Sequence, residues 1–315
     1  MSVLGLGLAA LGRPGYITVG HGEDFADDAS VDGMRANAWS VLDAAHELGI
    51  TYFDAARSYG LAEVFVAGWL DEQGSAAADA VVGSKWGYVY VGDWQVDADE
   101  HEVKIHTRQN LDTQYDESLG ILGSRLNLYQ IHSATLDSGV LDRADVLAKL
   151  ADMRDDGLII GASTSGPNQA AIIERMLEIE IGGELLFGAV EATWNLLEPS
   201  AGTALSNAHD AGLGVIVKEA VANGRLTPRD RGVSDRITRT SRVGASGTWT
   251  ADAVAIAAAV RQPWASAVLS GAATVEQLRS NVEALNVPDT VLDALGPLAE
   301  DPREYWTTRS QLPWQ

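Results

Sequence analysis

Short apolar runs alternate with amphipathic segments about eight times along the chain, and this alternation restricts the possible folds more than any other feature of the sequence. The apolar runs predict strands over residues 3–8, 50–53, 80–82, 126–131, 158–162, 187–192, 214–217 and 266–269. Strands separated by helices are typical of an α/β protein with a parallel sheet. Eight repeats favour a sheet closed into a (β/α)8, or TIM, barrel, and a doubly wound open sheet is the alternative.

The segments between the strands have the periodicity of helices. Residues 33–48 place apolar side chains on one face, and Leu111 and Leu119 belong to a second such stripe. Gly157 is positioned to end a helix, and Thr274 to Gln277 has the spacing of a capping box. No linker interrupts the pattern, so residues 1–315 are expected to form one domain. The longest irregular stretches, residues 12–32 and 223–247, follow predicted strands and should lie on the catalytic face of a barrel.

Composition excludes several classes of function. Asp and Glu total 44 against 22 Lys and Arg, a formal net charge of −22, which disfavours binding to nucleic acid or anionic membranes. Without cysteine there is no disulfide framework or thiolate metal site, and no metal site is expected. The absence of cysteine also leads us to expect a cytoplasmic protein. No run is long enough to span a membrane, and no basic segment precedes the first apolar run, which is therefore expected to be a strand and not a signal peptide. The acidity is either an ordinary solvated surface or an adaptation to high salt.

Polar residues stand at the ends of the predicted strands, where barrel enzymes carry their chemistry. Any one of them could be structural, but two of only four lysines in the chain fall there. The residues at these ends are Asp54 with Tyr59, Lys85, His132, Ser163 with Thr164, and Lys218 with Glu219.

These residues suggest a proton donor. A buried Lys85 needs a counter-ion, and Asp54 on the neighbouring strand can supply it. An ammonium beside the Tyr59 hydroxyl should lower the tyrosine pKa from about 10, making it a proton donor near neutral pH. His132 could then hydrogen-bond the same carbonyl oxygen that Tyr59 protonates.

The sequence resembles the aldo-keto reductases over nearly its whole length. The motifs FDAARSYG, GSKWG, LYQIHSA, IGASTSG, WNLLEP and SGAATVEQLRSN occur in the order found in that family. The resemblance implies a TIM barrel that binds NADP(H) in an extended form, with NAD(H) as the other possible coenzyme. It also implies a catalytic tetrad of Asp54, Tyr59, Lys85 and His132, and hydride transfer from the nicotinamide to an aldehyde or ketone, or the reverse.

The resemblance extends unevenly to the coenzyme site. The positions that match are Ser163, Thr164, Glu191, Lys218, Gly271, Gln277 and Asn281. Thr164 stands for the family's asparagine, Glu191 for its glutamine, and Lys218 for an aromatic residue that stacks on the nicotinamide. Ala273 replaces a common arginine, so we expect weak selection for the 2′-phosphate.

Two further expectations concern substrate and activity. Trp86, in an aromatic segment directly after Lys85, is a candidate wall of the substrate pocket. The main functional hypothesis is a reductase acting on a small carbonyl compound. The alternative is a nicotinamide-binding redox sensor or regulatory subunit with negligible turnover, and a lyase that forms a Schiff base on Lys85 is a third reading. The substrate and the oligomeric state cannot be read from the sequence.

Overall fold

Eight parallel strands form a closed barrel in the computed structural model, which describes residues 3–24, 28–241 and 248–314. The barrel strands are β1 (Leu4–Gly7), β2 (Tyr52–Asp54), β3 (Val81–Trp86), β6 (Leu126–Ala134), β7 (Ile159–Thr164), β10 (Ala189–Thr193), β11 (Gly214–Lys218) and β12 (Ala267–Ser270). Each strand pairs with the next in chain order, and β12 pairs with β1. The TIM barrel is therefore confirmed, and the alternative of an open sheet is wrong.

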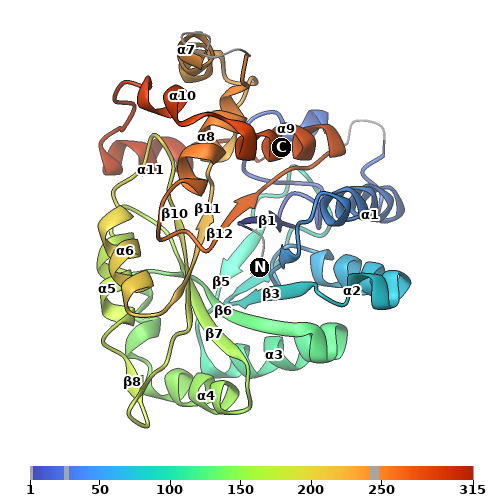
Figure 1. Cartoon of the computed structure of the whole chain (residues 1–315). Helices are drawn as coiled ribbons and strands as arrows, with labels where there is room; N and C mark the ends of the chain where they lie inside the picture. The colour runs from blue at the N-terminus through green and yellow to red at the C-terminus, as the bar shows by residue number, and fades with distance from the viewer. Residues whose placement is uncertain (1–2, 25–27, 242–247, 315) are drawn as a thin grey trace.

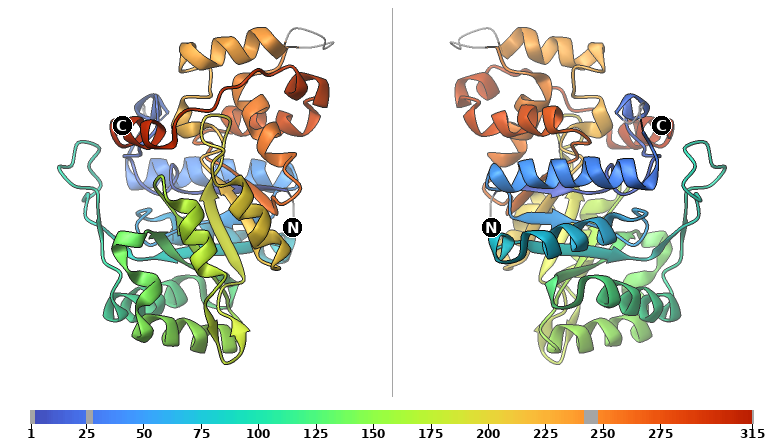
Figure 2. Two further views of the ribbon diagram at one scale, coloured as in Figure 1. Left: turned by 90° about the vertical axis from the view of Figure 1, so that its left-hand side faces the viewer. Right: turned by 90° about the vertical axis from the view of Figure 1, so that its right-hand side faces the viewer.

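Helices surround this barrel (Figures 1 and 2). They are α1 (Val31–Glu47), α2 (Ala62–Gln73), α3 (Arg108–Leu122), α4 (Ala144–Asp155), α5 (Gln169–Met176), α6 (Gly202–Asp210), α7 (Arg231–Ser241), α8 (Ala251–Val260), α9 (Val275–Val282), α10 (Asp289–Asp293) and α11 (Pro302–Ser310). Two hairpins add to the described structure: β4 (Tyr88–Tyr90) with β5 (Glu102–Lys104), and β8 (Glu180–Ile181) with β9 (Glu184–Leu185). The β4–β5 hairpin extends from the carboxyl end of β3.

The eight predicted strands all form, but several extend beyond the apolar runs. The third ends at Trp86, the fourth at Ala134 and the fifth at Thr164. Backbone pairing continues through polar residues because every residue supplies an N–H and a C=O group, whatever its side chain. The last residues of these strands therefore belong to the rigid barrel and not to the loops that follow.

The helix signals were partly correct. Gly157 has a φ of 98°, as expected of a glycine that ends a helix, and the Thr274 hydroxyl accepts from the Gln277 amide at 3.3 Å. The reciprocal bond of a capping box is replaced, because the Gln277 side chain accepts from the Ala273 amide at 2.8 Å. Leu119 is 38% exposed, so it does not belong to the buried stripe of α3.

The predicted irregular stretch of residues 223–247 contains helix α7, and its residues 242–247 lie outside the described residues. The helix was missed because it has few apolar residues, of which Ile237 is buried. The other stretch, residues 12–32, includes the start of α1, and its residues 25–27 also lie outside the description.

Apolar side chains fill the space between the barrel and its helices and also the lower part of the barrel interior. The interior cluster consists of Tyr52, Leu128, Ala189, Ile216, Ala267 and Leu269. These residues come from β2, β6, β10, β11 and β12 and point inward on the alternation of each strand. Because they close the lower barrel, a ligand can enter only at the carboxyl ends of the strands.

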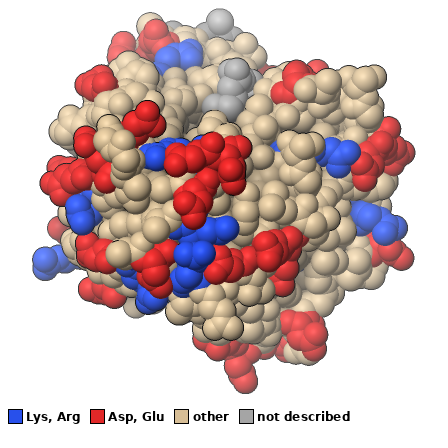
Figure 3. Space-filling view, turned by 90° about the horizontal axis from the view of Figure 1, so that it is seen from below, with Lys and Arg blue, Asp and Glu red and all other residues tan. Residues whose placement is uncertain are grey.

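On the face of the molecule seen from below, acidic and basic side chains lie next to one another, and the basic ones do not form a continuous patch (Figure 3). Exposed ion pairs such as Arg125–Asp71 at 2.5 Å and Arg175–Asp142 at 3.0 Å use some of the carboxylates. None of the helices in the described ranges has the length and apolar character needed to span a bilayer.

Candidate active site

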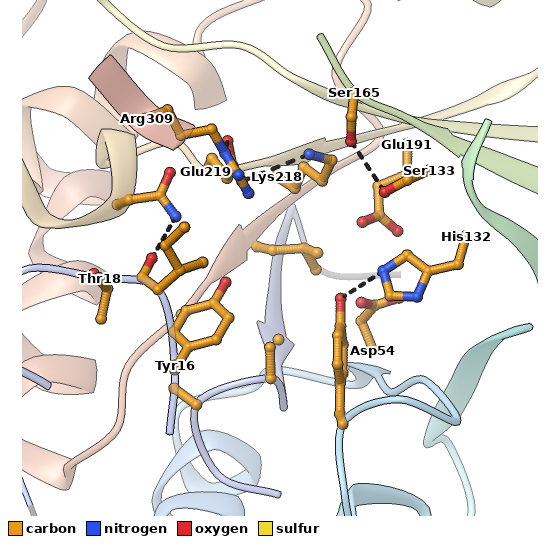
Figure 4. Close-up of a pocket in the computed structure, with 18 of the residues that line it drawn as sticks. Tyr16, Thr18, Asp54, His132, Ser133, Ser165, Glu191, Lys218, Glu219 and Arg309 are labelled. Carbon is orange, nitrogen blue, oxygen red and sulfur yellow. Dashed lines mark hydrogen bonds and ion pairs between the residues drawn. The ribbon is translucent and has the colours of Figure 1, made fainter. Parts of the chain in front are cut away.

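A cavity of about 270 Å³ lies at the carboxyl ends of the barrel strands (Figure 4). Asp54 and Tyr59 enter it from the end of β2 and the loop that follows, His132 from β6, Glu191 from β10 and Lys218 from β11. Five predicted site residues from four strands thus share one cavity. The parallel barrel produces this convergence, because the same end of every strand faces the same side.

Tyr59 and His132 meet at one edge of the cavity. The Tyr59 hydroxyl lies 3.4 Å from His132 Nε2, and the other ring nitrogen, Nδ1, lies 3.4 Å from the Ser58 hydroxyl. Burial, together with the charges of Lys85 and Lys218, lowers the His132 pKa well below its usual 6.5. The imidazole is therefore neutral at physiological pH and can donate one hydrogen bond.

Lys85 lies beneath Tyr59 and has no exposed surface. Its ammonium pairs with the Asp54 carboxylate, donates to the Ala55 carbonyl at 3.3 Å and lies 5.2 Å from the centre of the Tyr59 ring. Burial lowers the Lys85 pKa, but the carboxylates of Asp54 and Glu191 outweigh burial, and the net shift is upward. Lys85 is thus a fixed cation that supports the tyrosine from below.

Trp86 does not form a wall of this cavity. Successive side chains of a strand point to opposite faces, so Lys85 points into the barrel and Trp86 points out toward the helices. Trp86 is fully buried and contacts the His106 ring at a centroid distance of 5.7 Å. The prediction for Trp86 is therefore wrong, and Tyr88 and Trp314 are the aromatic residues that line the described cavity beside Tyr16 and Tyr59.

Glu191 is a second counter-ion of Lys85. Its carboxylate lies 3.3 Å from the ammonium and accepts a hydrogen bond from the Gln130 side-chain amide at 2.8 Å. Burial and the charge of Glu191 raise the Asp54 pKa to about 7. One lysine therefore neutralises only part of the negative charge of two buried carboxylates.

Burial and the two carboxylates together reverse the expected effect on Tyr59. The sequence predicted that Lys85 would lower the tyrosine pKa. In the structure, burial and the carboxylates of Asp54 and Glu191 raise the Tyr59 pKa well above its usual 10. Tyr59 is accordingly a protonated phenol over the whole physiological range, which is the form that donates a proton.

The outer part of the cavity contains an ion pair that was not predicted. Arg13 donates to Glu102 on β5 at 2.9 Å and to the Ser58 carbonyl at 2.7 Å, and its guanidinium lies 4.8 Å from the centre of the Trp314 ring. Arg13 is 2% exposed. It thereby joins the loop after β1, the Tyr59 loop, the β4–β5 hairpin and the C-terminal segment.

A second unpredicted ion pair faces the first across the cavity. Arg309 on α11 donates to both carboxylate oxygens of Glu219, the shorter contact being 2.5 Å. Lys218 lies 3.7 Å from Glu219 and donates to the Thr193 hydroxyl at 2.8 Å. Burial would raise the Glu219 pKa, but Arg309 and Lys218 lower it to about 2. Burial lowers the Lys218 pKa.

A second cavity of about 310 Å³ continues from the first toward α9. The two cavities share Thr18, Val221 and Gly271, and the predicted residues Gln277 and Asn281 line the second. A Cβ added to Gly271 would meet no atom within 4 Å, so the glycine leaves open space where the cavities join. The pair forms one elongated site suited to an extended dinucleotide with its reactive end at Tyr59.

Ser163 and Thr164 meet the predictions only partly. The Ser163 hydroxyl accepts from the Ser133 amide at 2.8 Å, next to the first cavity. The Thr164 side chain points the other way, toward Gln169 and the Glu191 carbonyl at 3.5 and 3.4 Å, and does not line the described cavity. Adjacent strand residues cannot both face inward, so Ser163 is the one on the side of the barrel interior.

The far end of the second cavity is acidic. Asp24, Asp252 and Glu276 line it, while the Arg229 guanidinium pairs with Asp24. Arg279 is exposed and is not among the described residues that line this cavity. No described group of three or more His, Cys, Asp and Glu side chains is arranged to hold a metal ion.

Comparisons with known proteins agree with this architecture. A protein from Pseudomonas aeruginosa described as an aldo-keto reductase superposes with a TM-score of 0.63 and 22% identity, covering 94% of this chain and 91% of its own. An aldo-keto reductase from Bacillus halodurans, in its holo form, gives a TM-score of 0.69 and 18% identity, with coverage of 96% and 95%. No curated protein sequence matches. The family model for aldo/keto reductases matches residues 4–294, and the chain therefore belongs to the aldo-keto reductase family.

Proposed function

We propose that this protein is a nicotinamide-dependent reductase of aldehydes or ketones in which Tyr59 donates the proton. The observation that carries this proposal is the position of the Tyr59 hydroxyl, 3.4 Å from His132 Nε2, at the closed end of a cavity that continues to α9. A carbonyl oxygen placed between the phenol and the imidazole would meet two hydrogen-bond donors. This arrangement suits stabilisation of the oxyanion that develops during carbonyl reduction.

Each residue has a separate task in this mechanism. The bound coenzyme supplies a hydride to the carbonyl carbon. Tyr59 gives its proton to the carbonyl oxygen, and neutral His132 donates from Nε2 to orient that oxygen. Lys85 and Asp54 are both buried and hold the tyrosine from below. Lys85 stays charged because its pKa is raised, whereas Asp54, with a pKa of about 7, can bind and release a proton near neutral pH.

The coenzyme fits the elongated site through residues of both cavities. The Glu191 carboxylate would accept a hydrogen bond from the nicotinamide carboxamide, and the Ser163 hydroxyl would donate one to it. Gly271 leaves room for the part of the coenzyme that links its two ends. Gln277 and Asn281 would contact the adenosine end. Thr274 caps the N-terminus of α9, the helix that carries Gln277 and Asn281. We propose NADP(H) as the coenzyme, because hydroxyl groups such as those of Thr227 and Ser280 line this cavity and can hold a phosphate. NAD(H) should also be accepted, because the described lining offers only Arg229 and His21 as basic groups among several carboxylates.

The charged lining of the first cavity also bears on the substrate. Arg13, Glu102, Tyr16 and Arg309 present hydrogen-bonding groups around the space in front of Tyr59. Burying an apolar substrate there would strip these groups of water without replacing their hydrogen bonds. We therefore expect small carbonyl compounds that carry hydroxyl or other polar groups.

The alternative function is a nicotinamide-binding sensor with negligible turnover. One observation favours it: Tyr59 has a raised pKa, and a weaker acid transfers its proton more slowly. A Schiff-base lyase is disfavoured, because Lys85 needs to be a neutral amine for that chemistry and its pKa is raised.

An absorbance assay tests these functions. Oxidation of NADPH or NADH is followed with hydroxyaldehydes, aldoses, aromatic aldehydes and cyclic ketones. Turnover above about 1 per second, within the ordinary range for enzymes, supports the reductase, and coenzyme binding with turnover below about 1 per hour supports the sensor.

A cytoplasmic location, expected from the cysteine-free sequence, is a separate proposal that cell fractionation tests.

A further inference from the structure

Lys85 lies between two carboxylates, and the mechanism above gives no task to its ion pair with the second of them, Glu191. Asp54 pairs with the ammonium from β2, and Glu191 approaches it to 3.3 Å from β10. The three residues are at most 1% exposed, so water does not disperse their charge. With all three ionised, the cluster carries one net negative charge, directly beneath the Tyr59 ring.

Glu191 is held in this position by more than Lys85. The Gln130 amide donates to its Oε2 at 2.8 Å from the neighbouring part of the barrel interior. The Tyr52 hydroxyl donates in the same way to Asp54, at 3.1 Å. These hydrogen bonds stabilise the carboxylates as anions, yet a like charge within a few ångströms opposes ionisation of both. Burial and the charge of Glu191 accordingly raise the Asp54 pKa to about 7.

The other charges around Tyr59 compensate one another in pairs. Arg13 is paired with Glu102, and Arg309 with Glu219. Lys218 is the remaining cation, and it is directed at Thr193 and Glu219. The charged and titratable groups that face Tyr59 from the packed elements are Arg13, Tyr16, Asp54, Lys85, Glu102, His132, Glu191 and Lys218.

We propose that Glu191 is a positioning residue that biases this site toward carbonyl reduction: as a second counter-ion of Lys85, it opposes the ammonium's influence on Tyr59 and, together with burial and Asp54, keeps the phenol protonated. The inference rests on the proposed function, because reduction needs the phenol as an acid and alcohol oxidation needs the phenolate as a base. Glu191 leaves the equilibrium of the reaction unchanged. It moves oxidation to a higher pH range.

The test variant is Glu191→Gln, which keeps the shape and can still accept from Gln130 but removes the charge. The ligand-free protein is labelled with ¹³C at the tyrosine Cζ, and Tyr59→Phe assigns the Tyr59 signal. We expect no ionisation of Tyr59 below about pH 10 in the wild type, and an ionisation at least roughly one pH unit lower in the variant, the usual scale for one nearby charge.

Kinetics provide the second measurement. The pH profile of kcat for alcohol oxidation should move to lower pH in Glu191→Gln by the same amount as the NMR titration, and the decline of reduction at high pH should begin earlier. The matched control is Glu63→Gln, another buried glutamate paired with an arginine, Arg57, at 2.5 Å, but absent from the described cavity lining. It should leave the Tyr59 ionisation where it is.

Two outcomes overturn the proposals separately. If Glu191→Gln turns over normally and Tyr59 ionises at the same pH as in the wild type, the inference about Glu191 is wrong and the proposed function stands. If the Tyr59 signal shifts but the wild type reduces no carbonyl compound, the proposed function fails, and the directional bias fails with it.

Discussion

Replacing Lys85 with methionine should destabilise the protein in a pH-dependent way. Methionine keeps an unbranched side chain of similar length but removes the cation that Asp54 and Glu191 share. Both carboxylates stay buried, with hydrogen bonds from Tyr52 and Gln130 but with no cation between them.

The size of the effect follows from the geometry. Two unit charges 3.3 Å apart attract by roughly 5 kcal/mol at an effective dielectric constant of about 20. The cost of burying the ions offsets much of this attraction, but removing one partner of a buried pair leaves the other charge uncompensated. The usual loss is about 3–5 kcal/mol of unfolding free energy, and we expect this loss near pH 8.

The pH dependence has a definite sign. Lys85 lowers the Asp54 pKa, so its removal should leave that pKa further above the value of the unfolded chain, and the folded variant binds more protons. Stability is then greatest below the unfolded carboxyl pKa of about 4 and declines as the pH rises through the folded values. The wild type shows the same sign, since Asp54 titrates at about 7.

Urea unfolding at pH 5.5 and 8, followed by tryptophan fluorescence, measures this. Lys149→Met on α4, where the lysine lies over the Tyr115 ring at 5.6 Å, is the control and should change stability by no more than about 0.5 kcal/mol. Lys85→Met/Glu191→Gln should recover about 1–3 kcal/mol relative to Lys85→Met, because one unpaired charge is gone. A Lys85→Met variant that loses less than about 1 kcal/mol at pH 8, or loses the same at both pH values, would refute the two-carboxylate reasoning.

Three other predictions concern activity, coenzyme and salt. Tyr59→Phe should lower kcat at least about 100-fold with little change in coenzyme affinity, because proton donation acts in the transition state; retention of more than about a tenth of kcat would exclude Tyr59 as the acid. Ala273→Arg should tighten NADPH binding by about 1–2 kcal/mol and leave NADH nearly unchanged, measured as dissociation constants by fluorescence; a wild type that already prefers NADPH about a thousandfold would contradict it. If the excess of 44 acidic over 22 basic residues reflects high salt, Tm should rise between about 0.1 M and 2 M KCl, where the Debye length falls from about 10 Å to 3 Å or less; a flat or falling Tm would assign the acidity to ordinary surface composition.

The barrel and most of its site could be predicted because both depend on local signals. Apolar runs mark strands, and the residue at the carboxyl end of each strand must face the common end of the barrel. Asp54, His132 and Glu191 all reach the first cavity for this reason. Neighbouring residues of a strand, however, point to opposite faces, and the prediction did not take this into account. Trp86 and Thr164 were therefore assigned to the site together with Lys85 and Ser163, although they point away from the barrel interior.

The unpredicted parts depend on distant segments of the chain. Arg13, Glu102 and Arg309 meet around the cavity from the loop after β1, from β5 and from α11. No local pattern marks such residues, and their pairing depends on how the loops fold over the barrel. The direction of the Tyr59 pKa shift was wrong for a related reason: Glu191 was considered only as a coenzyme contact, and its proximity to Lys85 appears only when the barrel closes.

The placement of lysine in this acidic chain follows from what the site requires of a cation. Lys218 lines the first cavity, Lys85 lies beneath Tyr59, and Lys104 donates to the carbonyl of the lining residue Ser133 at 2.9 Å, so three of the four lysines lie at or next to this cavity. Arginine serves exposed ion pairs and also the pairs with Glu102 and Glu219 at the cavity, where its planar group can meet a carboxylate with two N–H bonds. Lys85 instead has to bond Asp54, Glu191 and the Ala55 carbonyl in different directions within a closed barrel, and a compact ammonium with three N–H groups can do this where a planar guanidinium would not fit.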